Sequence, residues 1–523
     1  MRVLWILSFL AMPVAGAAQA RPNSTVDTTV AKSAAAKSML RAIPVLQSAV
    51  TAVTPRGNNG IDALRSLSSL STDRTMLVTK HGQGLRPGTP SVVHAVLLTR
   101  IDQKASRIFR LRDLEIEGGQ IWGSGTIITP SAGYDLTFGN RAYRAGSAAE
   151  FANQRLAILR GEVPTLLLSA WNRPETLRSL GTERIHGRAS DVISFADADG
   201  SVVTLYVDHE THLPLRSEVL ADNPTRGDQA VQTDYSDYRM VQGFRLPFKT
   251  IQDGPGPERW ETDLARVELN TAIADSVFVP PSVLALSPAA PPMFKKLGDG
   301  VYGMSEGAVI EFHDFVVVFE AYGSSRASIG KLASIRQTFP GKPVRYVVSS
   351  HFHDDHLGGV CPYVAEGVTL LTTRDAEPRI RQVLAARHEM RPDTFSVRTS
   401  VPAIEIIERS RVIEDGTQRL ELYQIGPTAH VDQILIGYLP KEKILIEGDL
   451  LDMGNGRPNA GGEDTEQLAA KLRELHLDVE RIIPIHGMPG TLRDLEKALQ
   501  MHRARAKCPR ELVQRLFCDW SSR

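Results

Sequence analysis

The stretch that decides the fold is SSHFHDDHLGG, residues 349–359, in which three histidines and two aspartates stand within six residues. It directly follows VRYVV, residues 344–348, which its apolar pattern predicts to be a buried strand. The ligand-type side chains are therefore expected at the carboxyl end of that strand, where loops of an α/β fold carry chemistry on a rigid support. The two glycines that close the stretch let the backbone turn tightly beside a bound group.

The spacing of these residues indicates two neighbouring metal positions. His351 and His353 are two residues apart, so in extended backbone their imidazoles point the same way. Asp355 and His356 are adjacent, so their side chains diverge and can reach a second position. A polar loop that is merely rich in histidine is the alternative, and the H-x-H-x-D-H order argues against it.

This order, followed by Gly-Gly, resembles the signature of the metallo-β-lactamase fold hydrolases. Three further segments follow in that family's order. GPTAH (426–430) is similar to the loop with the third histidine, LIEGD (445–449) to the strand that ends in a bridging carboxylate, and IIPIHG (482–487) to the strand with the last histidine. The resemblance covers roughly residues 294–505 and implies an α+β fold, the αββα sandwich.

The resemblance also implies a complete set of seven metal ligands. It places His351, His353 and His430 on one metal and Asp355, His356 and His486 on the other, with Asp449 able to bridge them. Imidazole and carboxylate ligands without thiolate suit Zn²⁺, and also Fe or Mn. We therefore expect two zinc ions per chain. Asp449 stands where zinc β-lactamases carry cysteine, so the set is closer to that of glyoxalase-II-like hydrolases.

The implied chemistry is hydrolysis. Two metals a few Å apart lower the pKa of a shared water, so that hydroxide exists near neutral pH. We expect this metal-bound hydroxide to attack an ester, thioester, lactone or amide-type carbonyl, with Asp355 or Asp449 orienting it. Two alternatives stay open: a mononuclear iron dioxygenase of the same fold, and a carrier of a lipid-like ligand with a secondary metal site.

Residues 1–20 are expected to be a secretory signal peptide. Arg2 precedes an apolar core at 3–15, and Ala18-Gln19-Ala20 forms an A-x-A-like cleavage site. The core is shorter than the ~20 residues that span a bilayer, which argues against a retained anchor. We therefore expect a periplasmic or secreted protein without stable membrane insertion.

The charge of the chain limits the classes of partner that we expect, and its three cysteines have separate expected states. The 523 residues include 60 Lys+Arg and 60 Asp+Glu, so no overall field attracts nucleic acid or acidic membrane. We expect a small-molecule substrate and no nucleic-acid partner, and the oligomeric state stays open. Cys361 is expected to be a buried thiol rather than a ligand. Cys508 and Cys518 could close a small disulfide loop in an oxidising compartment.

Residues 21–285 are expected to form a β-rich accessory domain. Helices are predicted at 32–53 and 60–70, and strands from about 92 to 275 with a helical insertion at 148–170. The series resembles the periplasmic lipoprotein-carrier domains, which are antiparallel half-barrels closed by helices. We expect no ligands from this half, because His186, His209 and His212 are scattered and are interpreted as solvated or hydrogen-bonded side chains.

The remaining boundaries follow from composition. A proline-rich, uncharged linker is predicted at 277–293, the catalytic domain at 286–505 and a cysteine-bearing tail at 506–523. The basic run at 374–400 indicates a solvated helix face, with contact to an anionic substrate as the alternative. Three helices are predicted in the catalytic domain, at 329–338, 465–475 and 492–504, and strands include 307–312, 315–319 and 369–373.

Overall fold

The computed structural model describes residues 25–56, 59–115, 121–138, 142–254, 258–287, 293–304, 306–390, 402–454 and 456–505. The expected signal peptide at 1–20, residues 391–400 of the basic run and the tail with Cys508 and Cys518 lie outside these ranges. Within the described ranges, no helix combines the length and the apolar character needed to cross a membrane.

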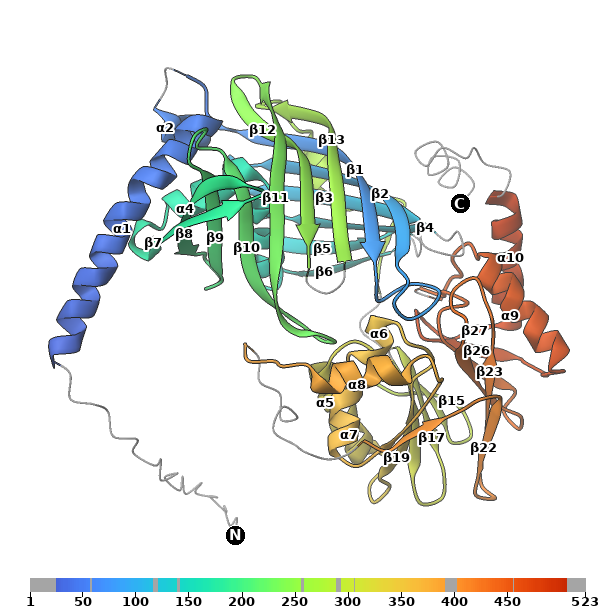
Figure 1. Ribbon diagram of the computed structural model, residues 1–523. Helices are drawn as coiled ribbons and strands as arrows, with labels where there is room; N and C mark the ends of the chain where they lie inside the picture. Colours follow the sequence, from blue (N-terminus) through green and yellow to red (C-terminus); the bar gives the residue numbers. More distant parts are fainter. Residues whose placement is uncertain are drawn as a thin grey trace, which may run out of the picture.

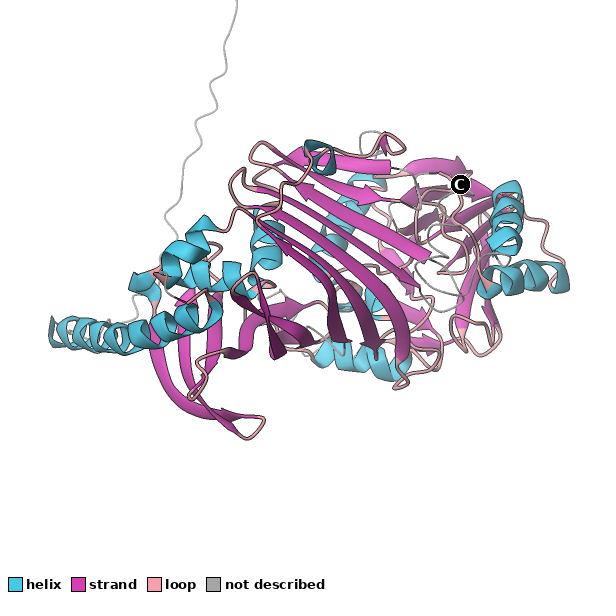
Figure 2. Ribbon diagram, turned by 90° about the horizontal axis from the view of Figure 1, so that it is seen from above, coloured by secondary structure: helices cyan, strands magenta, loops and turns pink. Residues whose placement is uncertain are grey.

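A 14-stranded sheet forms most of the first half of the chain, and its long strands are visibly curved (Figures 1 and 2). The strands are β1 Ser69–Lys80, β2 Ser91–Asp102, β3 Arg107–Glu115, β4 Ile121–Ile128, β5 Ala132–Thr137, β6 Ala142–Ser147, β7 Arg178–Ile185, β8 Arg188–Ala196, β9 Val202–Asp208, β10 Pro214–Asn223, β11 Gly227–Val241, β12 Phe244–Asp253, β13 Glu258–Leu269 and β14 Ala285–Leu286. Antiparallel pairing of β1 with β13 joins the β1–β6 and β7–β13 meanders into one sheet. The expectation of a β-rich N-terminal domain is therefore confirmed.

Helices of the same half pack against part of one face of this sheet. They are α1 Thr25–Val53, α2 Gly60–Ser66, α3 Ala152–Arg160 and α4 Val163–Trp171. Buried apolar side chains from the helices, such as Leu46, Leu64 and Leu166, pack in one cluster with Ile193 and Leu205 of the strands. Burial of this apolar surface holds helices and sheet together.

Strand β1 was not predicted, and the helix predicted at 60–70 is too long. The helix ends at Ser66, and β1 begins at Ser69. Two of the buried positions of β1 carry Thr72 and Arg74 instead of apolar residues. Arg74 is tolerated there because its guanidinium lies 2.6 Å from the carboxylate of Glu162, also buried. The polar residues hide the alternation that identifies a strand.

The predicted linker at 277–293 is also partly wrong. Asp275–Phe278 is a 3₁₀ helix, and Ala285–Leu286 forms β14, which pairs in parallel with β6. The chain therefore stays attached to the edge of the large sheet until residue 286. The backbone of Ser287 donates a further hydrogen bond, of 2.7 Å, to the carbonyl of Tyr143.

The second half contains two smaller sheets that face each other. The seven-stranded sheet has β15 Lys295–Gly298, β16 Val301–Met304, β17 Gly307–Glu311, β18 Val316–Phe319, β19 Val344–Val348, β20 Thr369–Thr372 and β21 Ile404–Ile406. The six-stranded sheet has β22 Ser410–Glu414, β23 Arg419–Ile425, β24 Ile434–Leu439, β25 Ile444–Glu447, β26 Arg481–Pro484 and β27 Gly490–Thr491. Val317 and Phe319 of one sheet share a fully buried cluster with Leu435 and Ile446 of the other.

Helices flank both of these sheets (Figure 1). They are α5 Ser325–Thr338, α6 Asp354–Leu357, α7 Val360–Ala365 and α8 Glu377–Ala385 beside the first sheet, and α9 Glu463–Glu474 and α10 Leu492–Arg505 beside the second. The helices and strands predicted here are found within a few residues of their expected bounds. Helix α5 begins earlier than predicted because Ser324 is its N-cap and accepts a hydrogen bond from the backbone of Ala327.

Two hairpin tips of the large sheet reach the second half, one between β1 and β2 and one between β10 and β11 (Figure 1). At the second tip, the guanidinium of Arg379 donates to Thr225 at 3.0 Å and to Asp354 at 2.6 Å. Arg379 is therefore a buried interface residue and not part of a solvated helix face. Elsewhere in the basic run, Arg374 and Arg381 are exposed and paired with Glu408 and Glu377, as the solvated-face interpretation predicts.

Candidate metal centre

Four connections of the second half and the short helix α6 position the predicted ligands. His351 and His353 directly follow β19, and Asp355 and His356 lie in the short helix α6. His430 lies between β23 and β24, Asp449 follows β25, and His486 follows β26. The structure brings all seven residues together in two groups. These are His351, His353, His430 and Asp449, and Asp355, His356, Asp449 and His486, and within each group the ligand atoms lie within 4.8 Å of one another.

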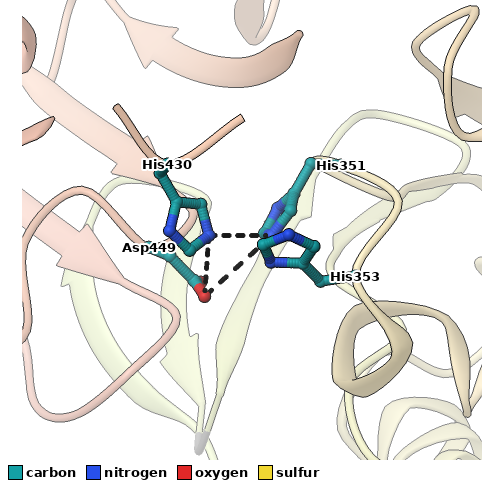
Figure 3. Close-up of side chains that lie close together, drawn as sticks. All are labelled: His351, His353, His430 and Asp449. Atoms are coloured by element: carbon teal, nitrogen blue, oxygen red, sulfur yellow. Dashed lines mark hydrogen bonds and ion pairs between the residues drawn. The ribbon is translucent and has the colours of Figure 1, made fainter. Parts of the chain in front are cut away.

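In the first group, ring nitrogens converge on one point (Figure 3). Nε2 of His430 lies 3.3 Å from Nε2 of His351, and Oδ2 of Asp449 lies 3.4 Å from the first and 4.0 Å from the second. Nδ1 of His353 is buried and has no hydrogen-bond partner among the described residues. Buried imidazole nitrogens that converge with a carboxylate oxygen form a donor set that fits a metal ion.

In the second group, Asp449 contributes again. Its Oδ1 lies 2.9 Å from Nε2 of His356, and its Oδ2 lies 3.3 Å from Nε2 of His486. Oδ2 of Asp355 lies 3.6 Å from His356 and 3.5 Å from His486. Two carboxylates and two imidazoles therefore surround a second position, and Asp449 is shared by both groups.

The electrostatics differ between the groups. Burial, reinforced by neighbouring imidazoles, lowers the pKa of His351 well below its ordinary value and that of His353 to about 3. Both rings are therefore neutral, which is the form that binds metal. Burial alone would raise the pKa of Asp449, but His356 and His486 hold it well below its usual range.

The second-group imidazoles shift in the opposite direction. Burial alone would lower the pKa of His356 and His486, but Asp449 and Asp355 raise both well above the ordinary value. Without metal, protons on these rings balance the charge of the carboxylates. A metal ion would replace the protons, because both bind the same nitrogen lone pairs.

Two of the predicted ligands have an outer hydrogen-bond partner that sequence reasoning missed. Nδ1 of His351 lies 2.9 Å from the hydroxyl of Ser350, and Nδ1 of His356 lies 3.1 Å from Oε2 of Glu320. Such partners fix the orientation and tautomer of a metal-binding ring. Glu320 follows β18 with no motif around it. Its positive φ of 92°, uncommon for a non-glycine residue, is visible only in the structure.

Other predicted features lie apart from the two groups. Cys361 is buried on α7 and belongs to neither group. His186 and His209 are exposed and pair with Asp234 and Asp191 at 2.8 and 3.1 Å, in keeping with the interpretation of solvated, hydrogen-bonded histidines.

Comparison with known families agrees with this geometry. Residues 308–486, which include all seven predicted ligands, match the family model described as the metallo-beta-lactamase superfamily. Residues 308–486 are therefore a metallo-β-lactamase superfamily domain, and the resemblance to this family predicted from the sequence is confirmed.

Solved metallo-β-lactamase structures are similar to this chain. The enzyme from Pontibacter korlensis has 21% identity and a TM-score of 0.30, over 40% of this chain and 92% of that one. FIM-1 from Pseudomonas aeruginosa, in its mono-zinc form, has 21% identity and a TM-score of 0.32, over 43% and 100%. The enzyme from Hirschia baltica has 20% identity and a TM-score of 0.30, over 39% and 94%.

Proposed function

We propose that the protein is an exported, binuclear metal-dependent hydrolase. Residues 286–505 would be its catalytic αββα sandwich, and residues 21–285 an accessory domain. The position of Asp449 carries this proposal. Its Oδ2 faces His351, His430 and His486, while its Oδ1 faces His356. A carboxylate between two sets of imidazoles is suited to bridge two cations.

Zinc is the proposed metal, two ions per chain, because buried imidazoles and carboxylates without thiolate suit it; iron and manganese accept the same donors. Bound there, two such ions would supply a water acidic enough to act as hydroxide near neutral pH and a Lewis acid for a carbonyl oxygen.

The chain's own residues have defined tasks in this scheme. His351 and His353 are held neutral and ready to bind. Asp449 and Asp355 are held ionised, because nearby His356 and His486 lower the pKa of both carboxyls against the effect of burial. Ionised carboxylates at this position can orient a nucleophilic water and accept its proton.

The proposed substrate is a small molecule with an ester, thioester, lactone or amide-type carbonyl. The balanced charge of the chain offers no general attraction for nucleic acid. The second ligand group favours a two-metal hydrolase over a mononuclear iron dioxygenase, which needs fewer ligands. The seven converging ligand residues favour a hydrolase over a carrier of a lipid-like ligand, for which a metal site would be secondary.

Metal analysis together with a substrate panel tests the proposal. We expect about two zinc ions per chain and turnover of at least one class among esters, thioesters, lactones and amides, including β-lactams, by the zinc-loaded protein. One iron per chain, with oxygen consumed during turnover, would establish the dioxygenase alternative instead.

Export is a separate part of the proposal, supported by Arg2 and by Ala18-Gln19-Ala20. Protein recovered from the periplasm or the medium should begin near Arg21. An intact Met1 on the exported chain would contradict cleavage at this site.

A further inference from the structure

The hairpin tip between β1 and β2, residues 81–90, lies across the candidate metal centre although it belongs to the first half of the chain. We name it the β1–β2 loop. The carbonyl of Gly82 accepts from the backbone of Asp354 at 3.2 Å, and the carbonyl of Leu85 accepts from the backbone of Asp432 at 3.0 Å. Arg86 also forms an ion pair with Asp432. The loop is thus held on both sides of the centre, next to His353 and next to His430.

The backbone of this loop contacts a first-group ligand directly. Nε2 of His353 lies 3.0 Å from the carbonyl oxygen of Gly84, in a fully buried contact. A carbonyl only accepts hydrogen bonds, so Nε2 must carry the proton and Nδ1 keeps its lone pair. Nδ1 is the buried nitrogen with no hydrogen-bond partner among the described residues. The Gly84 carbonyl therefore selects the tautomer in which His353 can bind metal.

A side chain of the same loop contacts a second-group ligand. The amide Nε2 of Gln83 donates to Oδ1 of Asp355 at 2.8 Å. The other oxygen of this carboxylate, Oδ2, is the one that faces His356 and His486. Gln83 therefore holds Asp355 with its metal-facing oxygen directed into the second group.

Two glycines allow the loop to fit so closely. A Cβ at Gly82 would lie 2.3 Å from a carboxylate oxygen of Asp354, and a Cβ at Gly84 would lie 2.1 Å from the carbonyl oxygen of Thr89. Both distances are far inside van der Waals contact. A side chain at position 84 would force the Thr89 carbonyl or the Gly84 backbone to move, and the hydrogen bond to His353 would move with it.

We infer that the β1–β2 loop completes both metal sites as their outer hydrogen-bond layer, with Gly84 and Gln83 as positioning residues for His353 and Asp355. The accessory half thereby takes part in metal binding without contributing a ligand. This inference rests on the proposed binuclear centre. Loss of such outer partners typically lowers metal affinity by about 10- to 100-fold.

Metal titration of the full-length chain tests this inference. Protein freed of metal by a chelator is titrated with Co²⁺, followed by its visible absorption, and with Zn²⁺ in competition with a chromophoric chelator. Gln83→Leu removes the amide donor. The matched control is Gln252→Leu, in the same sheet, where the side chain donates to the carbonyl of Gly254 and lies outside both ligand groups.

For Gln83→Leu we expect the dissociation constant of the second metal equivalent to rise about 10-fold or more, with the first unchanged. The melting temperature of the metal-free variant should equal that of Gln252→Leu. For Gly84→Ala we expect the dissociation constant of the first metal equivalent to rise and the Co²⁺ absorption spectrum to change. If Gly84→Ala does not fold, the comparison of Gln83→Leu with Gln252→Leu is sufficient to test the inference.

Other outcomes are distinguishable. Unchanged dissociation constants for both equivalents in Gln83→Leu would overturn the inference, since the loop would then only join the two halves. Equal weakening of both equivalents, with a lower melting temperature of the metal-free protein, would also overturn it. A wild-type chain that binds no metal would refute the proposed function itself.

Discussion

Nδ1 of His356 lies 3.1 Å from Oε2 of Glu320, and both side chains are fully buried. A carboxylate at this distance accepts a hydrogen bond from the Nδ1–H group of His356. The other ring nitrogen, Nε2, therefore faces Asp449 at 2.9 Å. Glu320 holds this place with a φ of 92°, a conformation that costs a non-glycine residue about 1–3 kcal/mol. The surrounding fold keeps it there, which is typical of a residue that serves a site.

Glu320→Gln should weaken the second metal site. The amide can still accept from Nδ1, but it lacks the negative charge that makes His356 a stronger ligand. We expect the second metal equivalent to bind about 10-fold more weakly, with the first unchanged. Competition titration against a chelator measures this. Glu408→Gln, at an exposed ion pair with Arg374, is the control, and equal affinities in the two variants would contradict the role of Glu320.

Asp449→Asn should show whether Asp449 bridges two metals without being needed for the fold. The variant should keep the fold and the first metal, since three imidazoles remain there, and should lose affinity for the second metal. Turnover should fall by orders of magnitude with little change in KM. His351→Ala, in contrast, should lose the first metal and all activity. Metal per chain is measured beside kcat for both variants, and a fully active Asp449→Asn enzyme with two metals would exclude bridging.

Metal uptake should release protons near neutral pH. The pKa values of His356 and His486 lie well above the ordinary value in the metal-free protein, because Asp449 and Asp355 outweigh the effect of burial. Both rings are then protonated at neutral pH and must lose a proton to bind. Affinity for the second metal should therefore fall as pH is lowered. An indicator dye in weakly buffered protein measures the release. Metal binding with no proton release at pH 7 would contradict these protonation states.

Acid should weaken the turn between β22 and β23. Asp415 accepts from the backbones of His313, Thr417 and Gln418 at 2.6, 2.9 and 3.0 Å. Burial alone would raise its pKa, but these hydrogen bonds lower the pKa to about 2. The ordinary value is 3.8, so the stabilisation is complete above about pH 4 and is lost as pH falls towards 2.

Asp415→Asn should therefore lower the free energy of unfolding modestly at pH 7, and by less at pH 3. The effect is small because the side chain is exposed to solvent. Urea unfolding curves at the two pH values provide the measurement. A difference between variant and wild type that does not change with pH would show that the charge of Asp415 is not the cause.

The fold of the second half could be predicted because its signals are local. His351, His353 and His356 lie within six residues, directly after an apolar strand, and Asp449 and His486 each follow another apolar strand. A window of ten residues contains both the strand and its ligand. The metallo-β-lactamase fold presents these segments in a known order, and that order alone predicts that all seven residues come together.

The rest depends on partners far apart in the sequence. Arg74 is buried in β1 because Glu162, 88 residues later, neutralises it, so no local pattern marks the strand. Gly84 and His353 are separated by 269 residues, and the contact uses a backbone carbonyl that every residue possesses. Nothing near Gly84 in the sequence indicates that its carbonyl, among all others, contacts the ring of a predicted metal ligand.

The docked β1–β2 loop has a thermodynamic consequence. If contact with the loop tightens metal binding by some factor, metal binding must tighten the contact between the two halves by the same factor. Bound metal would then stabilise the contact between the two halves, in addition to its role in the reaction. In metal-free protein the contact between the two halves would be weaker, and proteases would cleave the chain sooner. The supply of metal would therefore help to determine the lifetime of the protein.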